Sequence, residues 1–274
     1  MEHTTAPIQW ISPATFVPAK FHTMELPAEF PGSILFCPEQ PVAALMLLHG
    51  AEGHPALWVQ GLAAYLAQRG IATLYYAWYG DTEGLPPQII DVPIGRAMQA
   101  LHWLKAEFNL KTALYGFSRG AELAAIIASI RARSTEFPAP DGLILHAGTN
   151  VINIPLSWDW AASATPYRED MLKFDYSVKP WHWDDLVDAV EVGDRIPIEK
   201  YPGPVLLVHG AEDQTYWVGQ AGYILHRLNG REGQPGLVRE LIFKGEGHAF
   251  SPPAEKLMRE AMVDFIVNQL ADAC

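Results

Sequence analysis

The chain has 274 residues, of which 49% are hydrophobic and 18% are charged, and its formal net charge at pH 7 is -12. This composition is typical of a globular protein that buries one large core, and it excludes a disordered chain. The acidic balance, with no basic stripe, argues against nucleic acid as a partner.

The cysteines and the apolar stretches indicate where the protein works. Cys37 and Cys274 form neither a disulfide framework nor a zinc-binding spacing, which favours a reduced compartment. No apolar stretch reaches the length that crosses a bilayer, and the first residues lack the basic and apolar regions of a signal peptide. We therefore expect a cytoplasmic protein that has no membrane partner.

Residues 1–42 are rich in proline and hold two short β-like runs, at 15–22 and 33–37. Proline suits the edge of a sheet because it donates no ladder hydrogen bond. The sequence therefore predicts N-terminal edge strands or a hairpin in this segment.

From residue 43 onwards, apolar strands alternate with helices. The predicted strands cover residues 43–48, 71–76, 112–115, 142–146, 204–208 and 237–243, and the predicted helices cover residues 56–69, 92–108, 122–129, 216–229 and 254–271. Continuous apolar strands indicate a parallel sheet that is covered on both faces, and alternation with helices provides that cover. The predicted fold class is α/β, with residues 1–274 forming a single domain.

Residues 148–200 interrupt the alternation, and we interpret them as a lid or insertion over the carboxyl ends of the strands, where ligands bind in open α/β sheets. Because binding pockets favour aromatic linings, the residues assigned to substrate binding are tryptophans: Trp158, Trp160, Trp181, Trp183 and Trp217. The alternative is a surface excursion whose aromatic side chains only pack onto the body of the protein.

One short motif lies between a predicted strand and a predicted helix. Residues Gly116–Gly120 read Gly-Phe-Ser-Arg-Gly, which is the pattern of the nucleophile elbow in α/β-hydrolases. The pattern alone also arises by chance, but the flanking strand and helix give it the context that an elbow requires. It predicts the α/β-hydrolase fold, a mainly parallel sheet with helices on both faces, and Ser118 as the nucleophile.

A serine nucleophile needs a base and an orienting acid, which follow it in the order Asp or Glu and then His. Asp213 lies in the loop after the strand at 204–208, with Glu212 as the competing carboxylate, and His248 lies in the loop after the strand at 237–243. The sequence therefore predicts a catalytic triad of Ser118, Asp213 and His248.

The predicted oxyanion hole takes its two N–H donors from Arg119, directly after the nucleophile, and from Ala51, in the loop after the strand at 43–48. His49 and His54 could instead bind a metal ion together with Glu52. A tight loop explains the same residues, and no further ligands cluster in the sequence, so we predict neither a metal nor a cofactor.

Three motifs resemble those of the acyl-CoA thioesterase and bile acid-CoA:amino acid N-acyltransferase family. They are GFSRGAEL at Gly116–Leu123, IPIEKYPGPVLLVHGAED at Ile196–Asp213, and Gly247-His248 followed by a pair of prolines at 252–253. The resemblance covers about residues 43–274, without the N-terminal β-rich domain of that family. It implies the same triad and a thioester acyl donor, and serine in place of the cysteine of some members goes with hydrolysis.

The first hypothesis is therefore a serine hydrolase that cleaves a small-molecule acyl thioester or ester through an acyl-enzyme. One alternative is a carboxylesterase similar to dienelactone hydrolase that acts on small oxygen esters. Another is an acyltransferase with an amine or alcohol acceptor, and a third is a ligand-binding relative without activity. The sequence specifies neither the acyl group nor the oligomeric state.

Overall fold

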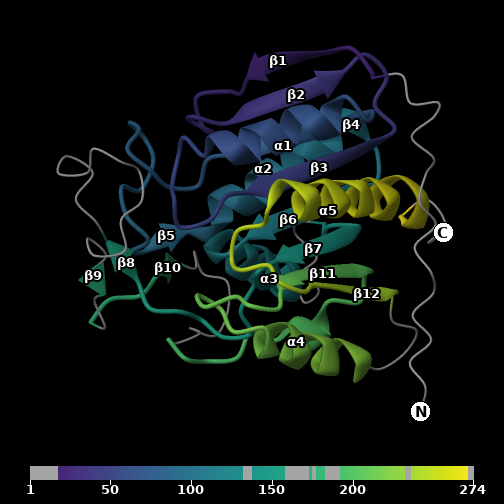
Figure 1. Cartoon of the computed structure of the whole chain (residues 1–274). Helices are drawn as coiled ribbons and strands as arrows, with labels where there is room; N and C mark the ends of the chain where they lie inside the picture. The colour runs from purple at the N-terminus through teal and green to yellow at the C-terminus, as the bar shows by residue number, and fades with distance from the viewer. Residues whose placement is uncertain are drawn as a thin grey trace.

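The computed structural model describes residues 18–131, 138–157, 173–174, 177–182, 192–231 and 236–270. Its centre is an eight-stranded sheet in the order β1-β2-β4-β3-β6-β7-β11-β12 (Figure 1). The strands are β1 (Phe21–Glu25), β2 (Ile34–Pro38), β3 (Ala43–Leu48), β4 (Ile71–Tyr76), β6 (Thr112–Phe117), β7 (Gly142–His146), β11 (Val205–Gly210) and β12 (Val238–Phe243).

The sheet is parallel from β4 to β12 and antiparallel only at the β1–β2 edge, where β2 also pairs with β4. Every residue of β3, β4, β6, β7 and β11 is buried, which confirms the interpretation of their apolar runs as central parallel strands. The strand predicted to start at residue 15 begins at Phe21, and residues 15–17 lie outside the described part.

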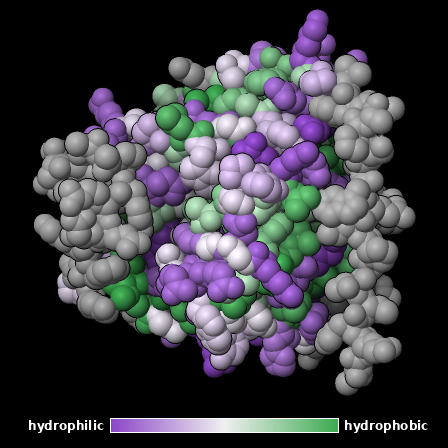
Figure 2. Space-filling view, viewed as in Figure 1, coloured by the Kyte–Doolittle hydropathy of each residue, from purple (hydrophilic) through white to green (hydrophobic). Residues whose placement is uncertain are grey.

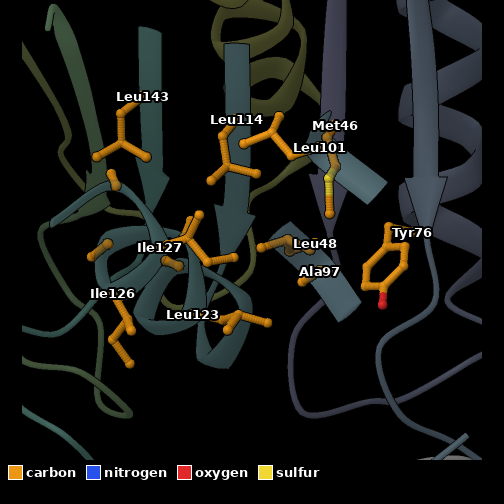
Figure 3. Packing of buried hydrophobic residues seen from close by; sticks show 14 of the residues in the cluster. Met46, Leu48, Tyr76, Ala97, Leu101, Leu114, Leu123, Ile126, Ile127 and Leu143 are labelled. Atoms are coloured by element: carbon orange, nitrogen blue, oxygen red, sulfur yellow. The ribbon is translucent and has the colours of Figure 1, made fainter. Parts of the chain in front are cut away.

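Helices cover both faces of this sheet, and successive residues of the central strands face opposite helices. One core cluster joins Met46 and Leu114 to α2 (Ile94–Phe108), α3 (Arg119–Arg131) and α4 (Gly219–Asn229), and Figure 3 shows part of it. The other cluster joins the alternate positions of the same strands to α1 (Leu57–Ala67) and α5 (Pro252–Asp264). These two layers of helices pack against the sheet and fix the positions of the ends of β3, β6, β11 and β12. The candidate site forms at these strand ends.

The helix ends that differ from the sequence-based expectation include the start of α4 and the end of α5. The helix predicted from residue 216 begins at Gly219, because the Asp213 carboxylate accepts the backbone N–H groups of Thr215 and Tyr216 and holds them in the preceding loop. The helix predicted to run to residue 271 changes after Asp264 into a short π-helix, η4 (Phe265–Gln269).

Two pairs of short strands lie beside the main sheet. The strand β10 (Trp181–His182) pairs with β5 (Val92–Pro93), and β8 (Leu156–Ser157) pairs with β9 (Lys173–Phe174). Figure 1 shows all four strands together to one side of the main sheet. Part of the predicted insertion is therefore structured. Its role as a lid stays a prediction, because Trp158, Trp160 and Trp183 lie outside the described residues.

Within the described ranges, none of the helices is long and apolar enough to cross a membrane. On the face shown in Figure 2, hydrophobic residues form small groups separated by hydrophilic ones. The exposed large hydrophobic side chains include Trp217, Tyr223 and Leu57.

Candidate active site

Ser118 stands at the turn between β6 and α3 in a left-handed backbone conformation, with φ at 53°. Few residues other than glycine adopt this conformation, so it marks a strained position of the kind found at functional sites. A Cβ atom on Gly116 would lie 2.1 Å from the Gly120 carbonyl oxygen, and one on Gly120 would lie 2.3 Å from the His49 carbonyl oxygen. The two glycines therefore let strand, helix and neighbouring loop approach closely enough to form the turn.

The structure brings together the three residues that the sequence assigned to the triad. His248 Nε2 lies 2.9 Å from Ser118 Oγ, and His248 Nδ1 lies 2.8 Å from Asp213 Oδ2. Because a carboxylate only accepts, Nδ1 carries the proton and Nε2 is left to accept the serine O–H. This is the hydrogen-bond order in which a histidine acts as a general base toward a serine.

Asp213 is held in its ionised form by several donors. Its carboxylate side chain is fully buried, and it accepts N–H groups from Thr215 and Tyr216 at 2.8 and 2.9 Å. Burial alone would raise the pKa of Asp213, but hydrogen bonds from His209, His248 and the backbone N–H of Tyr216 hold it well below its usual range. Asp213 is thus a carboxylate at neutral pH and suits the orientation of His248.

His209, at the end of β11, is a second neighbour of this carboxylate. Its Nε2 lies 2.7 Å from the Tyr216 carbonyl oxygen and 3.2 Å from Asp213 Oδ2. Both of these oxygens accept, so Nε2 carries a proton shared between them. In the sequence, the only indication of the His209–Asp213 contact is their i,i+4 spacing across a strand end. That spacing is too common to identify such a contact.

The loop after β3 carries Ala51, whose backbone N–H is one of the two predicted oxyanion donors. The hydroxyl of Tyr79 donates to the Ala51 carbonyl oxygen, and Trp78 Nε1 donates to the His49 carbonyl oxygen at 2.9 Å. Neither Ala51 N–H nor Arg119 N–H donates a backbone hydrogen bond to the described residues. Both predicted donors, Ala51 N–H and Arg119 N–H, are therefore available to an oxyanion. Hydrogen bonds to the carbonyl oxygens of His49 and Ala51 hold the loop after β3 in place.

The three residues weighed as metal ligands each have a protein partner. His49 Nδ1 donates to the Gly50 carbonyl oxygen at 3.0 Å, His54 Nδ1 lies 3.1 Å from the Tyr75 hydroxyl, and Glu52 accepts from Trp58 Nε1 at 2.9 Å. Burial lowers the pKa of His49 to about 3 and raises the pKa of Glu52. Among the described residues, no group of three or more His, Cys, Asp or Glu side chains could hold a metal ion.

Glu122 is a buried residue that sequence reasoning missed. Its carboxylate, with 0% exposure, accepts from Arg119 Nη1 at 2.8 Å, from Trp181 Nε1 at 2.8 Å and from Asn153 Nδ2 and N at 2.7 and 3.1 Å. Trp181 and Asn153 belong to the predicted insertion, and Arg119 follows the nucleophile. Glu122 therefore fixes the described part of the insertion to the first turn of α3.

Two of the predicted substrate-binding tryptophans can be located. Trp181 is buried, and its ring lies 5.4 Å from both the Arg119 guanidinium and the Trp78 ring. Trp217 is 64% exposed and contacts Tyr223 on α4. The neighbouring Tyr216, not Trp217, places its ring edge-on to His248 at 5.6 Å.

A buried histidine near the elbow makes stability depend on pH. Burial, the largest cause, lowers the pKa of His146 to about 3, and His146 Nδ1 lies 2.9 Å from the Tyr115 hydroxyl. An unfolded histidine titrates near pH 6.5, so the unfolded state binds the extra proton between these two values. Stability present above pH 6.5 is therefore lost as the pH falls, by about 2 kcal/mol at pH 5 for each such histidine.

We expect His146→Gln to reduce the acid sensitivity of the fold, since Gln keeps an acceptor for Tyr115 but does not titrate. The free energy of unfolding, measured in urea at pH 7.5 and 5.0, should fall by about 2 kcal/mol less than in the unmodified protein. His226→Gln is the matched control, because His226 is exposed. Equal losses in the unmodified protein and in His146→Gln would contradict this prediction.

Comparison with known proteins gives one curated relative. The peroxisomal succinyl-coenzyme A thioesterase of Mus musculus is 24% identical over an alignment of 250 residues, which covers 84% of this chain and 56% of that protein. The chain thus matches a little over half of the length of this relative. No family model matches the chain.

Solved structures resemble the protein over most of its length. TT1662 from Thermus thermophilus has a TM-score of 0.62 at 19% identity, covering 93% of this chain and 100% of that one. A protein provisionally described as a dienelactone hydrolase, from Klebsiella pneumoniae, has a TM-score of 0.60 at 13% identity, covering 92% and 99%. MGS-M1, an α/β-hydrolase enzyme from a deep-sea metagenome, has a TM-score of 0.55 at 15% identity, covering 92% and 99%.

These likenesses, the mostly parallel sheet and the elbow define one class of protein. The chain has the α/β-hydrolase fold, as its sequence predicted. At these identities the resemblance establishes the fold alone.

Proposed function

We propose that the protein is a serine hydrolase that cleaves an acyl thioester or ester of a small molecule. The observation that carries the proposal is the continuous hydrogen-bond chain from Ser118 through His248 to the buried Asp213, at 2.9 and 2.8 Å. A serine on a left-handed turn, a base within hydrogen-bonding distance and an orienting carboxylate are the groups that acyl transfer requires.

The reaction proceeds in two halves. His248 Nε2 accepts the Ser118 proton as Oγ bonds to the acyl carbon, and the N–H groups of Ala51 and Arg119 bind the oxyanion. His248 then gives its proton to the leaving thiolate or alkoxide, and the carbon–sulfur or carbon–oxygen bond breaks. Water, deprotonated by His248, attacks the acyl-enzyme, and the carboxylic acid leaves as Ser118 recovers its proton. Asp213 stabilises the charged imidazole in both halves.

We favour a thioester as the acyl donor. The three sequence motifs resemble those of acyl-CoA thioesterases, and the curated relative is named as a thioesterase. Oxygen esters are the alternative, favoured by the likeness to a protein described as a dienelactone hydrolase. Thiolate is the better leaving group, so a site that hydrolyses oxygen esters should also accept thioesters, and the rates decide which substrate it prefers.

Two measurements test this function. A fluorophosphonate probe should modify Ser118, located by mass spectrometry of the digested protein, because only an activated serine reacts quickly with such a probe. Butyryl-CoA should be hydrolysed with a kcat/KM at least about ten times that for methyl butyrate, an unactivated oxygen ester of the same acyl group. Absence of labelling in the folded protein would contradict the serine mechanism, and the opposite rate order would make oxygen esters the substrate class. Butyryl transfer to an added amine in preference to water would identify an acyltransferase.

A further inference from the structure

Two imidazole rings meet at one oxygen of the proposed catalytic acid. Asp213 Oδ1 accepts the backbone N–H groups of Thr215 and Tyr216. The other oxygen, Oδ2, lies 2.8 Å from His248 Nδ1 and 3.2 Å from His209 Nε2. The base of the proposed triad and a second histidine, whose side chain is 1% exposed, therefore compete for the same carboxylate oxygen.

The contacts of His209 show that it faces the acid as a donor. Its Nε2 lies 2.7 Å from the Tyr216 carbonyl oxygen, an atom that can only accept. Nε2 therefore carries a proton, and it shares that proton between the carbonyl oxygen and Asp213 Oδ2 as a three-centre donor. The shorter contact, to Tyr216, holds the ring in place beside the acid.

A second donor changes how strongly the acid stabilises a charged base. Each hydrogen bond to a carboxylate offsets part of its negative charge, so the carboxylate attracts a neighbouring cation less strongly. The side chains of Asp213 and His209 are 0% and 1% exposed, so water screens this effect only weakly. Without the His209 donor, Asp213 would stabilise the charged form of His248 more, and His248 would keep its second proton to a higher pH.

We propose that His209 is a positioning residue that shares Asp213 Oδ2 with His248 and so keeps His248 free to act as a base at lower pH. The inference rests on the proposed hydrolase function and adds a fourth residue to its triad. A purely structural His209 would hold the Tyr216 carbonyl group and the acid loop in place. Loss of either role lowers activity, so the pH dependence, not the rate alone, distinguishes the two.

Other titratable groups act on these two rings from the neighbouring elements. They are His146 on β7, Glu240 on β12, Glu52 in the loop after β3, and Glu246, two residues before His248 and bonded to Ser251. Among the described residues, none of these four side chains is hydrogen-bonded to Asp213. All four remain in place when His209 is replaced, so a changed pH dependence reports on the His209 donor.

The test measures kcat/KM for the preferred acyl donor from about pH 5 to 9, because His248 must lose a proton to act as a base. His209→Leu removes the donor, and the midpoint of the acidic limb should rise by about 0.5 to 1 pH unit, the size of one hydrogen bond to a charged group. In the acidic limb this shift makes the variant about three to ten times slower, beyond any loss that is independent of pH.

His209→Gln is the conservative variant, because its amide N–H can take the place of the Nε2 donor. It should keep the midpoint of the unmodified protein. The matched control is His226→Leu, which makes the same replacement at an exposed histidine of α4 and should leave the midpoint unchanged. If His209→Leu does not fold, His209→Met replaces it with a longer, unbranched apolar side chain.

Nuclear magnetic resonance tests the same inference without a substrate. In the unmodified protein, the long-range proton–nitrogen correlations of the imidazole rings should show His209 protonated at Nε2, a measurement that needs no variant. In His209→Leu, the ring resonances of His248 should titrate at a midpoint that is higher by the same amount as the kinetic one.

An unchanged or lower midpoint in His209→Leu, together with a lower kcat at every pH, would overturn the proposal and leave His209 a structural role. An equal shift in His209→Leu and His209→Gln would overturn it as well, since the donor would then not be the cause. So would a His209 ring protonated at Nδ1 alone, because Nε2 could not donate. If no acyl donor is hydrolysed but the His248 titration still shifts, the hydrolase proposal fails and the coupling between the two histidines stands.

Discussion

Ser118→Ala should lower kcat/KM for every acyl donor by roughly four to six powers of ten, to a residual rate that the oxyanion donors alone can support. The substitution removes Oγ, the atom 2.9 Å from His248 Nε2, and no other atom of the described site replaces it as a nucleophile. Without it no acyl-enzyme forms, so a rapid-quench experiment should also show no burst of released thiol.

The fold should tolerate this change. Serine and alanine both carry a Cβ atom, so the strain at φ 53° is the same before and after substitution. The lost hydrogen bond to His248 should change the free energy of unfolding by no more than about 1.5 kcal/mol. Circular dichroism and the melting temperature would therefore separate a loss of chemistry from a loss of structure.

Ser129→Ala is the matched control. Ser129 is also buried, in the helix that follows the elbow, and its hydroxyl donates to the Ala125 carbonyl oxygen at 2.6 Å. Its substitution should leave kcat/KM within a few-fold of the original value. Near-normal hydrolysis by Ser118→Ala would exclude the serine mechanism, whatever the control shows.

The sequence could predict the parts of the fold and site that depend on neighbouring residues. The central strands were predicted because a strand buried on both faces must be apolar throughout, as at Ala43–Leu48. The elbow was predicted because backbone approach at Gly116 and Gly120 excludes any side chain. Asp213 and His248 were found by the same logic, since each lies in a loop directly after a strand of the parallel sheet.

Features that depend on residues distant in the sequence could not be predicted. Glu122 is a surface-type residue by composition, and its burial depends on Asn153 and Trp181, which lie 31 and 59 positions further along. Nothing local to α3 specifies those partners.

Aromatic composition locates site residues less precisely than the positions of the strand ends do. It assigned Trp181 and Trp217 the same role, but Trp181 is buried beside Arg119 and Trp217 is 64% exposed. An indole in a loop is compatible with either position, because its apolar ring favours burial and its N–H can remain in water. The positions of the loops that carry Ser118, Asp213 and His248, in contrast, are fixed by the ends of the strands in the sheet.

Asp213→Asn should lower kcat by about four powers of ten while leaving the protein folded. The Asn carbonyl oxygen can still accept the N–H groups of Thr215 and Tyr216, which now bind Asp213 Oδ1 at 2.8 and 2.9 Å. Its NH₂ group then faces His248 Nδ1 in place of Oδ2. Because NH₂ only donates, Nδ1 must become the acceptor, and the ring proton moves to Nε2. In that tautomer His248 cannot accept the proton of Ser118, so the nucleophile is not activated.

Glu212→Gln tests the competing carboxylate in the same loop. Glu212 is exposed and is not hydrogen-bonded to His248, so its substitution should change kcat by less than about threefold. The two variants should also differ in labelling: the fluorophosphonate probe should modify Ser118 slowly in Asp213→Asn and at the normal rate in Glu212→Gln. The reverse pattern would make Glu212 the acid and would require His248 to turn away from Asp213. If the probe modifies Ser118 at the normal rate in both variants, Ser118 is activated without a carboxylate partner, and the proposed triad is wrong.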